Sequence, residues 1–348
     1  MKKLLSIVLV IGILMSVMSL SVSAVDTALN EEETATVLTT MTRADIDGDG
    51  TYSTKDATKL LRAVAGIEAV EADYDLDLDG TVSLVDAQKM LRVAADLDNT
   101  VDDETLLMFF TDSLNGIKVK KPGFKRTITN VCPSVKVTTS GAPISSLNVS
   151  NMEYRNYVDT FIKTMGTFGS LLDDEMKKEL ELMKQSAVDI YKPQTETKSV
   201  AATSNSHYTN FPVNNLGWSC KLEKSDIKTI KQTVADGKII ITVTFDNFKY
   251  NKGEYPTGSG GFGDRQKLPY GKVFNLPALN ESDGAVVNSM EFKNGVVVLK
   301  LDAATGNVAE VDYSFSYVAD ITSAKTEGSD LVMRTVTNTN TNENYIVG

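Results

Sequence analysis

The chain has 348 residues, a formal net charge of −11 and a hydrophobic content of 42%, a length that suggests about two globular domains. Its acidic balance argues against nucleic acid as a partner, because phosphate backbones bind basic surfaces. The two cysteines, Cys132 and Cys220, are too few for a disulfide scaffold or a cysteine-based zinc site. They can form one possible disulfide or remain as two free thiols.

The N-terminal residues 1–24 predict a secretory signal peptide. Lys2 and Lys3 precede a long uncharged apolar run, and Val22 and Ala24 stand at the minus-three and minus-one positions of a cleavage site. The alternative is a single membrane anchor, because the run is close to the lower length limit for spanning a bilayer. We expect cleavage after Ala24 and a secreted protein, extracellular or in a cell-surface complex, with no membrane contact afterwards.

Four further segments follow the signal peptide. Residues 25–42 are rich in Thr and acid without an apolar period, which predicts a flexible linker. Residues 43–98 hold a duplicated acidic segment, with thirteen acidic and six basic residues and hence a net charge of −7. Residues 99–103 (NTVDD) form a polar joint, and residues 105–348 form a larger module.

The duplicated segment carries two acidic loops in the same register. DIDGDGTYSTKD, Asp45 to Asp56, returns thirty residues later as DLDLDGTVSLVD, Asp75 to Asp86. Each copy has Asp at positions one, three, five and twelve, Gly at six, Thr at seven and Ser at nine. Ca²⁺ takes six to eight oxygen ligands, which alternate residues of such a tight loop supply together with the seventh backbone carbonyl. The spacing predicts two structural Ca²⁺ ions, with ligands from Asp45, Asp47, Asp49, Thr51, Ser53 and Asp56 in the first loop and Asp75, Asp77, Asp79, Thr81, Ser83 and Asp86 in the second.

Each loop is followed by an amphipathic helix, in DATKLLRAVAG and DAQKMLRVAAD. We expect no helix ahead of either loop, because TTMTRA has no apolar period and GIEAVEADY is short and follows a glycine. A calcium sensor changes the angle between two helices that flank one loop. The pattern therefore disfavours a sensor.

The two repeats, of the form DxDxDGxxSxxD followed by a Leu-Arg pair in the helix, resemble a type I dockerin over residues 43–98. The resemblance implies an EF-hand-like, calcium-folded module that attaches a secreted bacterial protein to a cohesin on a scaffoldin or at the cell surface, typically in a cellulosome. Dockerins more often end the chain, whereas this segment lies near the N-terminus. In the family, loop positions ten and eleven and the Leu-Arg pair face the cohesin; here these are Thr54, Lys55, Leu61, Arg62, Leu84, Val85, Leu91 and Arg92.

The two copies differ at the positions that the resemblance assigns to the partner. Thr54 and Lys55 are polar or cationic, whereas Leu84 and Val85 are apolar. We therefore expect one dominant orientation of the cohesin. The alternative is that Leu84 and Val85 only cover their own helix.

The sequence of the larger module predicts an α+β fold in which helices precede an antiparallel β-meander. One-face apolar spacing predicts helices over residues 106–117, 154–165 and 172–191, and alternation predicts strands over 239–245 and 311–319. A final strand is expected over 331–336. Asn294 and Gly295 predict a tight hairpin, and residues 303–307 predict a second turn.

The sequence assigns no catalytic residue to the module, and we expect a non-catalytic cargo. Because dockerins usually carry glycoside hydrolases, the alternative is a polysaccharide-degrading O-glycosyl hydrolase or a glycan-binding module. A hydrolase needs two carboxylates that flank a sugar, and Glu153, Glu175, Glu223 and Glu254 show no such setting. Trp218 and His207 are the only Trp and His. A second alternative is an apolar-ligand carrier, which predicts a cavity between the helices and the sheet.

Overall fold

The computed structural model describes residues 29–140, 149–167, 169, 173–206, 210–211, 219–257, 262–279, 285–322 and 332–348. The predicted signal peptide, His207 and Trp218 lie outside these residues. Within the described part of the chain, no helix combines the length and apolar character needed to cross a bilayer.

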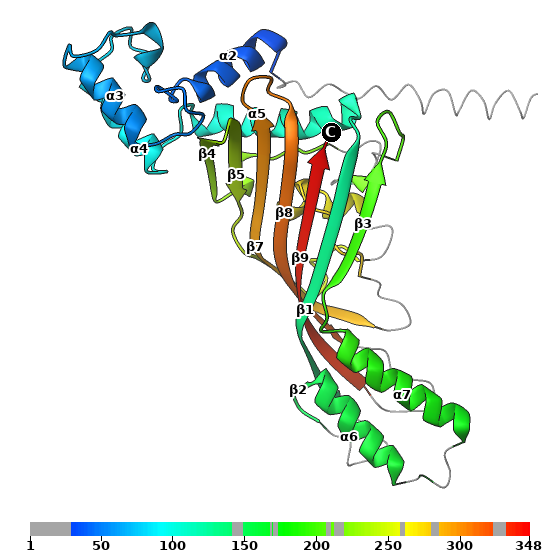
Figure 1. The fold of residues 1–348 in the computed structure, drawn as a ribbon. Coiled ribbons are helices and arrows are strands. Elements are labelled where there is room, and N and C mark those ends of the chain that lie inside the picture. The colour runs from blue at the N-terminus through cyan, green and yellow to red at the C-terminus, as the bar shows by residue number, and fades with distance from the viewer. Residues whose placement is uncertain are drawn as a thin grey trace, which may run out of the picture.

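The fold is α+β and is built on one antiparallel sheet (Figure 1). In the described residues the strand order is β2-β1-β9-β8-β7-β5-β4, with β3 also paired to β1 and β6 also paired to β7. The strands are β1 (Phe124–Ser140), β2 (Met152–Glu153), β3 (Gln194–Val200), β4 (Thr229–Ala235), β5 (Lys238–Thr244), β6 (Phe248–Asn251), β7 (Val286–Asp302), β8 (Val308–Thr322) and β9 (Val332–Val347). The helices are α2 (Glu31–Thr42), α3 (Thr54–Val64), α4 (Leu84–Ala94), α5 (Asp103–Lys120), α6 (Tyr154–Gly166), α7 (Asp174–Asp189) and α9 (Phe262–Arg265), with short 3₁₀ turns η1 (Ala72–Tyr74), η4 (Lys224–Asp226) and η5 (Tyr270–Lys272).

The acidic repeats and the α6–α7 pair lie at opposite ends of the long strands (Figure 1). Helices α3 and α4 lie on the β4 side of the sheet in Figure 1, and α2 and α5 contact β4 itself. One hydrophobic core runs from the repeats through α2 and α5 into the sheet. A separate small core lies under α6 and α7, formed by Val137, Val149, Tyr157, Val158 and Ala187. The repeats are therefore packed onto the sheet and share its core.

Several predicted elements are confirmed. Helices α5 and α6 cover two of the predicted helical segments, and α7 covers residues 174–189 of the third; β8 covers one predicted alternating strand, and β5 covers all but the last residue of the other. Along β5, Ile239, Ile241 and Val243 are buried while the residues between them are half-buried, the burial period that a sheet with one face on a core requires. The turn predicted at residues 303–307 joins β7 to β8.

The prediction of a flexible linker over residues 25–42 is wrong for residues 31–42, which form α2. Asn30 caps the helix by accepting from the N–H of Glu33, whose carboxylate accepts from the N–H of Asn30 in return, a capping box that satisfies two helix-end donors. Val37 and Met41 are four residues apart and both are buried. This apolar stripe is too short to stand out in the sequence, and tertiary packing supplies the stability that such a helix lacks alone.

The hairpin predicted at Asn294 and Gly295 is also wrong, because β7 runs through both residues. The pairing of β7 with β8 is irregular between Lys293 and Val296, and Asn294 has a φ of 54°. The N–H of Gly295 donates to the Tyr270 hydroxyl at 2.9 Å, and a Cβ on Gly295 would lie 2.6 Å from the Tyr270 ring. The Asn-Gly pair therefore provides a bulge and a close approach instead of a turn.

The prediction that the helices precede an antiparallel meander is correct for β4, β5, β7, β8 and β9 and wrong for β1. Strand β1 precedes α6 and α7 in the chain, yet it lies between β2 and β9 in the sheet. The final strand is also much longer than predicted, because Thr339, Thr341, Glu343 and Tyr345 alternate on its buried face. Glu343 can be buried there because the Tyr345 hydroxyl and Arg126 both donate to its carboxylate. Such polar residues conceal a buried strand face in the sequence.

The possible disulfide is not formed, since Cys132 and Cys220 are both free thiols. Cys220 is buried, and burial raises the pKa of its thiol to about 12. Cys132 lies on β1 and is half-buried.

Candidate calcium sites

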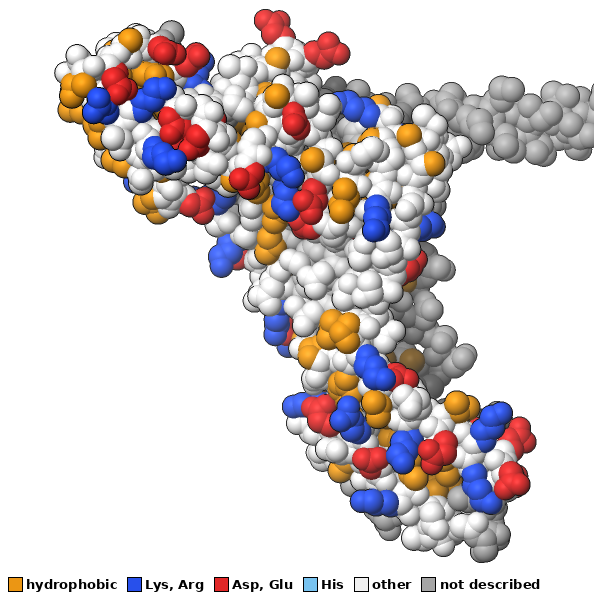
Figure 2. Space-filling view, in the orientation of Figure 1, with side chains coloured by type: hydrophobic (Ala, Val, Ile, Leu, Met, Phe, Trp, Pro, Cys, Tyr) orange, Lys and Arg blue, Asp and Glu red, His pale blue; other side chains and the backbone are white. Residues whose placement is uncertain are grey.

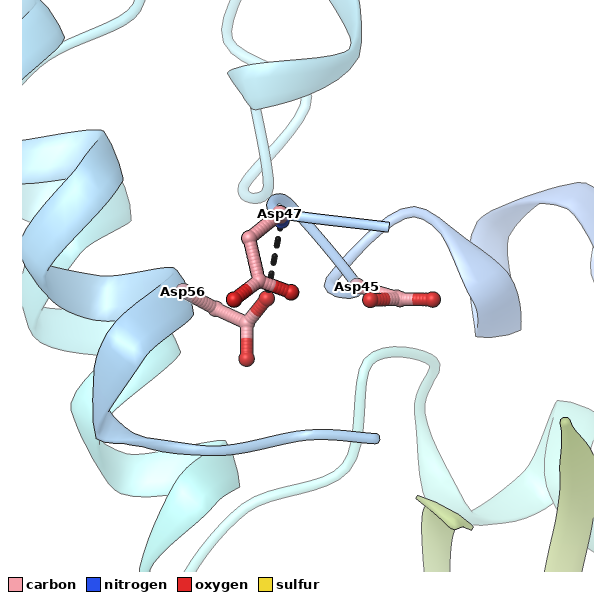
Figure 3. Close-up of side chains that lie close together, drawn as sticks. All are labelled: Asp45, Asp47 and Asp56. Atoms are coloured by element: carbon pink, nitrogen blue, oxygen red, sulfur yellow. Dashed lines mark hydrogen bonds between the residues drawn. The ribbon is translucent and has the colours of Figure 1, made fainter. Parts of the chain in front are cut away.

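Each repeat brings three of its four predicted aspartates together. Ligand oxygens of Asp45, Asp47 and Asp56 lie within 4.8 Å of one another, and the same holds for Asp75, Asp77 and Asp86. Figure 3 shows the first group, with Asp56 at the start of α3 and Asp47 facing it from the loop. The position-five residues of the loops, Asp49 and Asp79, are not among these groups.

The twelfth-position aspartates organise the loops around themselves. Asp56 is fully buried and accepts from the N–H of Asp47 at 3.0 Å and the N–H of Ser53 at 2.8 Å. Asp86 does the same for Asp77 and Ser83. These bonds fix the distance between the two ends of each loop, so the carboxylate that closes the site is held in place by backbone donors.

The residues at positions seven and nine lie within the loops but are engaged in local bonds. Ser53 and Ser83 cap α3 and α4, each as half of a capping box with the twelfth-position aspartate. Thr51 and Thr81 each donate a backbone N–H to the position-five carboxylate, at 3.0 and 2.8 Å. The capping role of the serines was not foreseen, although the S-x-x-D spacing ahead of each helix carries that signal.

The electrostatics of each loop fit a bound cation. Asp45 Oδ1 and Asp75 Oδ1 are buried and have no hydrogen-bond partner among the residues that the structure describes, a costly state for a charged oxygen in a protein. Burial raises the pKa of Asp45, and the charges of Asp56 and its loop neighbours raise it further. Burial and neighbouring carboxylates likewise raise the pKa of Asp77. Since the converging side-chain donors are hard carboxylate oxygens, the residues fit Ca²⁺.

No family model, curated protein or solved structure matches the chain. The assignment of the sites therefore depends on their geometry.

The two loops differ at position eleven. In the first loop, Lys55 Nζ lies 3.0 Å from Asp49 Oδ2, with the lysine side chain 73% exposed. In the second loop Val85 takes the equivalent place, and Asp79 has no ion pair among the described residues. A divalent cation in the first loop therefore has a competing positive charge close by.

A helix precedes the first loop, contrary to the prediction. Helix α2 ends at Thr42 and α3 begins at Thr54, so the first loop lies between two helices. Ahead of the second loop there is only the short turn η1. The sequence argument against a sensor thus holds for the second loop and fails for the first.

All eight residues predicted to contact a partner are exposed. Leu84, Val85 and Leu91 are 66%, 55% and 45% exposed, and apolar side chains gather on the outer edge of the α3–α4 lobe (Figure 2). The two arginines are engaged in ion pairs, Arg62 with Glu68 and Arg92 with Asp98.

Two exposed apolar residues that the sequence analysis missed extend this surface. Ile67 and Leu97 occupy equivalent positions thirty residues apart and are both exposed. Their spacing of thirty residues, which is the period of the repeat, was the signal in the sequence that could have found them. Together with Leu61, Leu84, Val85 and Leu91 they make up the exposed apolar side chains that we call the apolar patch, and exposed apolar residues that gather on one surface are typical of an interaction site.

The four acidic residues considered for hydrolysis in the larger module are not adjacent in the chain. The four acids considered for hydrolysis lie on separate segments: Glu153 ends β2, Glu175 begins α7, Glu223 precedes η4 and Glu254 follows β6. Among the described residues, only the two loops bring three metal-ligating side chains together.

An open cavity of about 800 Å³ lies between α2, α5 and the turn that joins β7 to β8. Leu38, Phe109 and Val308 line it, but so does Asp112, which accepts from the N–H of Leu29 at 2.8 Å. Burial raises the pKa of Asp112. The cavity lies where an apolar-ligand carrier needs one, although its lining is mixed.

Proposed function

We propose that residues 43–98 form a type I dockerin that binds two Ca²⁺ ions and attaches this protein, once secreted, to a cohesin of a scaffoldin or cell-surface complex. Residues 105–348 are then the attached cargo, which we propose to be non-catalytic.

One observation carries the proposal. Two aspartate groups in the same register each open a helix, and each contains a buried carboxylate oxygen that no protein group satisfies. A cation supplies the missing partner and removes the repulsion between neighbouring carboxylates. When bound, Ca²⁺ would be held by Asp45, Asp47 and Asp56 in the first loop and by Asp75, Asp77 and Asp86 in the second, and it would fix the position of the helix that follows.

The apolar patch supports a protein partner. Its residues belong to the α3–α4 lobe, on whose outer edge apolar side chains gather (Figure 2). Burying a large apolar side chain contributes roughly 1.5–3 kcal/mol, so Leu84, Val85 and Leu91 offer the anchors that a stable interface needs.

The proposal is tested by titrating the full chain against a panel of recombinant type I cohesins, in calcium and in EDTA. We expect at least one cohesin to bind in calcium and to dissociate in EDTA. The double variant Leu84→Thr/Val85→Lys, which gives the second copy the residues of the first, should lose most of this binding because it removes two apolar anchors.

The matched control is the reciprocal variant Thr54→Leu/Lys55→Val. It should retain binding, since it leaves the apolar anchors in place. If the first variant bound as well as the wild type, the expected orientation would be wrong. If calorimetry detected no calcium binding to the full chain, the dockerin assignment itself would be wrong.

A further inference from the structure

The first calcium loop is hydrogen-bonded to the edge of the sheet. The N–H of Tyr52 donates to the carbonyl of Val234 at 2.9 Å, and the N–H of Gly237 donates to the carbonyl of Gly50 at 3.1 Å. Strand β4 ends the strand order, so its outer edge would otherwise expose unpaired backbone groups. Loop positions six and eight therefore cover the end of this edge.

Side chains reinforce the contact between the loop and β4. Tyr52 is buried, and its hydroxyl accepts from Gln232 Nε2 at 3.1 Å. Gln232 is 1% exposed and lies on the inward face of β4. Its Nε2 also donates to the carbonyl of Met41 at 3.1 Å, and its Oε1 accepts from the hydroxyl of Thr100 at 2.7 Å. One side chain thus joins α2, the first loop and the segment before α5 to the sheet.

The second loop has no such attachment. Val82 stands where the first loop has Tyr52 and is only half-buried. Within the described residues, no hydrogen bond joins residues 75–86 to a strand of the sheet. Arg43 donates to the Asp75 carbonyl and Lys89 to the Leu76 carbonyl, and neither residue lies on a strand. The two loops share their aspartates and differ in their attachment to the sheet.

We propose that calcium binding by the first loop and docking of that loop on β4 are coupled, so that each strengthens the other. The inference rests on the proposed calcium function and goes beyond it. The backbone groups of Gly50 and Tyr52 can meet β4 only when the loop holds one conformation. Calcium fixes that conformation, and docking requires the same one. The conformational entropy of the loop is therefore lost only once for the two events. Coupling of this kind is reciprocal.

The experiment is a calcium titration of the full chain by calorimetry. Asp45→Asn and Asp75→Asn, each silencing one loop, assign the two affinities. Gln232→Ala is then compared with the wild type, and Thr229→Ala serves as a control, because Thr229 is on the same strand and its hydroxyl pairs with Thr244. We expect Gln232→Ala to weaken the first loop about fivefold to tenfold, within the usual range of coupling. The affinity of the second loop, and both affinities in Thr229→Ala, should change by less than about twofold.

A milder variant and a second measurement keep the test independent of folding defects. Tyr52→Phe removes one hydroxyl and keeps the ring, and it should weaken the first loop in the same direction but less. Amide exchange of the wild type should rise at Tyr52 and Gly237 on adding EDTA, while β8 stays protected.

The possible outcomes separate this inference from the proposed function. If both loops bind calcium, and the first loop of Gln232→Ala and of Tyr52→Phe binds it with the wild-type affinity, the coupling is refuted and calcium binding stands. Unchanged exchange at Tyr52 and Gly237 in EDTA would also refute the coupling. If neither loop binds calcium, the proposed function is refuted first.

Discussion

The two acidic repeats have nearly the same local structure and quite different surroundings. In both, a buried aspartate closes the loop and completes the capping box of the next helix. The first loop follows a helix and is bonded to the sheet, whereas the second follows a short turn and faces solvent. Two loops with the same spacing of aspartates can therefore have different places in the fold. The first repeat joins the lobe to the module, and we propose that the second presents most of the apolar surface for a partner.

The strongest test of this difference replaces the side chain at loop position eight. Tyr52→Ala should lower the free energy of unfolding by about 3–5 kcal/mol, because it empties a buried aromatic site. Val82→Ala should cost only about 1 kcal/mol, since Val82 is half-buried. Urea unfolding of both full-length variants in saturating calcium measures the two values. Equal costs would show that the repeats are attached alike.

An intermediate effect is expected from exchanging position eleven. Lys55→Val should raise the calcium affinity of the first loop about threefold at low salt, because it removes a cation that pairs with Asp49. Val85→Lys should lower the affinity of the second loop by a similar factor. Calorimetry at two salt concentrations checks both changes. The interpretation is contradicted if the changes have the same sign or do not shrink with added salt.

The smallest effect on the free energy of unfolding is expected from the arginine ion pair that both repeats share. Arg62→Ala and Arg92→Ala should each lower the free energy of unfolding only slightly, because both ion pairs are exposed to solvent. The hydrogen bond from Arg92 lowers the pKa of Asp98 from its ordinary value of 3.8. That stabilisation is present above the unfolded-state value and is lost as pH falls through the folded-state value.

The difference in unfolding free energy between wild type and Arg92→Ala should therefore shrink from pH 5 to pH 3. Paired urea titrations at these pH values measure it. A difference that grew on acidification would contradict the assigned sign.

The local elements of the repeats could be predicted from sequence. Helices α3 and α4 and the loops depend on residues within twelve positions of one another, such as Asp45 and Asp56. Helix α2 could not be predicted in the same way, because Val37 and Met41 gain their burial from distant parts of the chain. Tertiary contacts override weak local preference here.

The attachment between loop and sheet was the hardest feature to foresee. Gln232 is a polar residue at an inward position of an alternating strand, between Ile230 and Val234. That position signals a buried polar group that needs partners. Nothing in the sequence shows that those partners are Tyr52 and Thr100, far away in the chain.

The length of the strands has a mechanical consequence. Strands β1, β7 and β9 have 16 or 17 residues each, so at about 3.3 Å per residue they run for roughly 50 Å. A protein tethered through its repeats would carry the α6–α7 pair at the far end of this sheet. A pulling force along the strands would act on many of the hydrogen bonds between them at once. The sheet would therefore be a stiff spacer between the attached repeats and the α6–α7 pair.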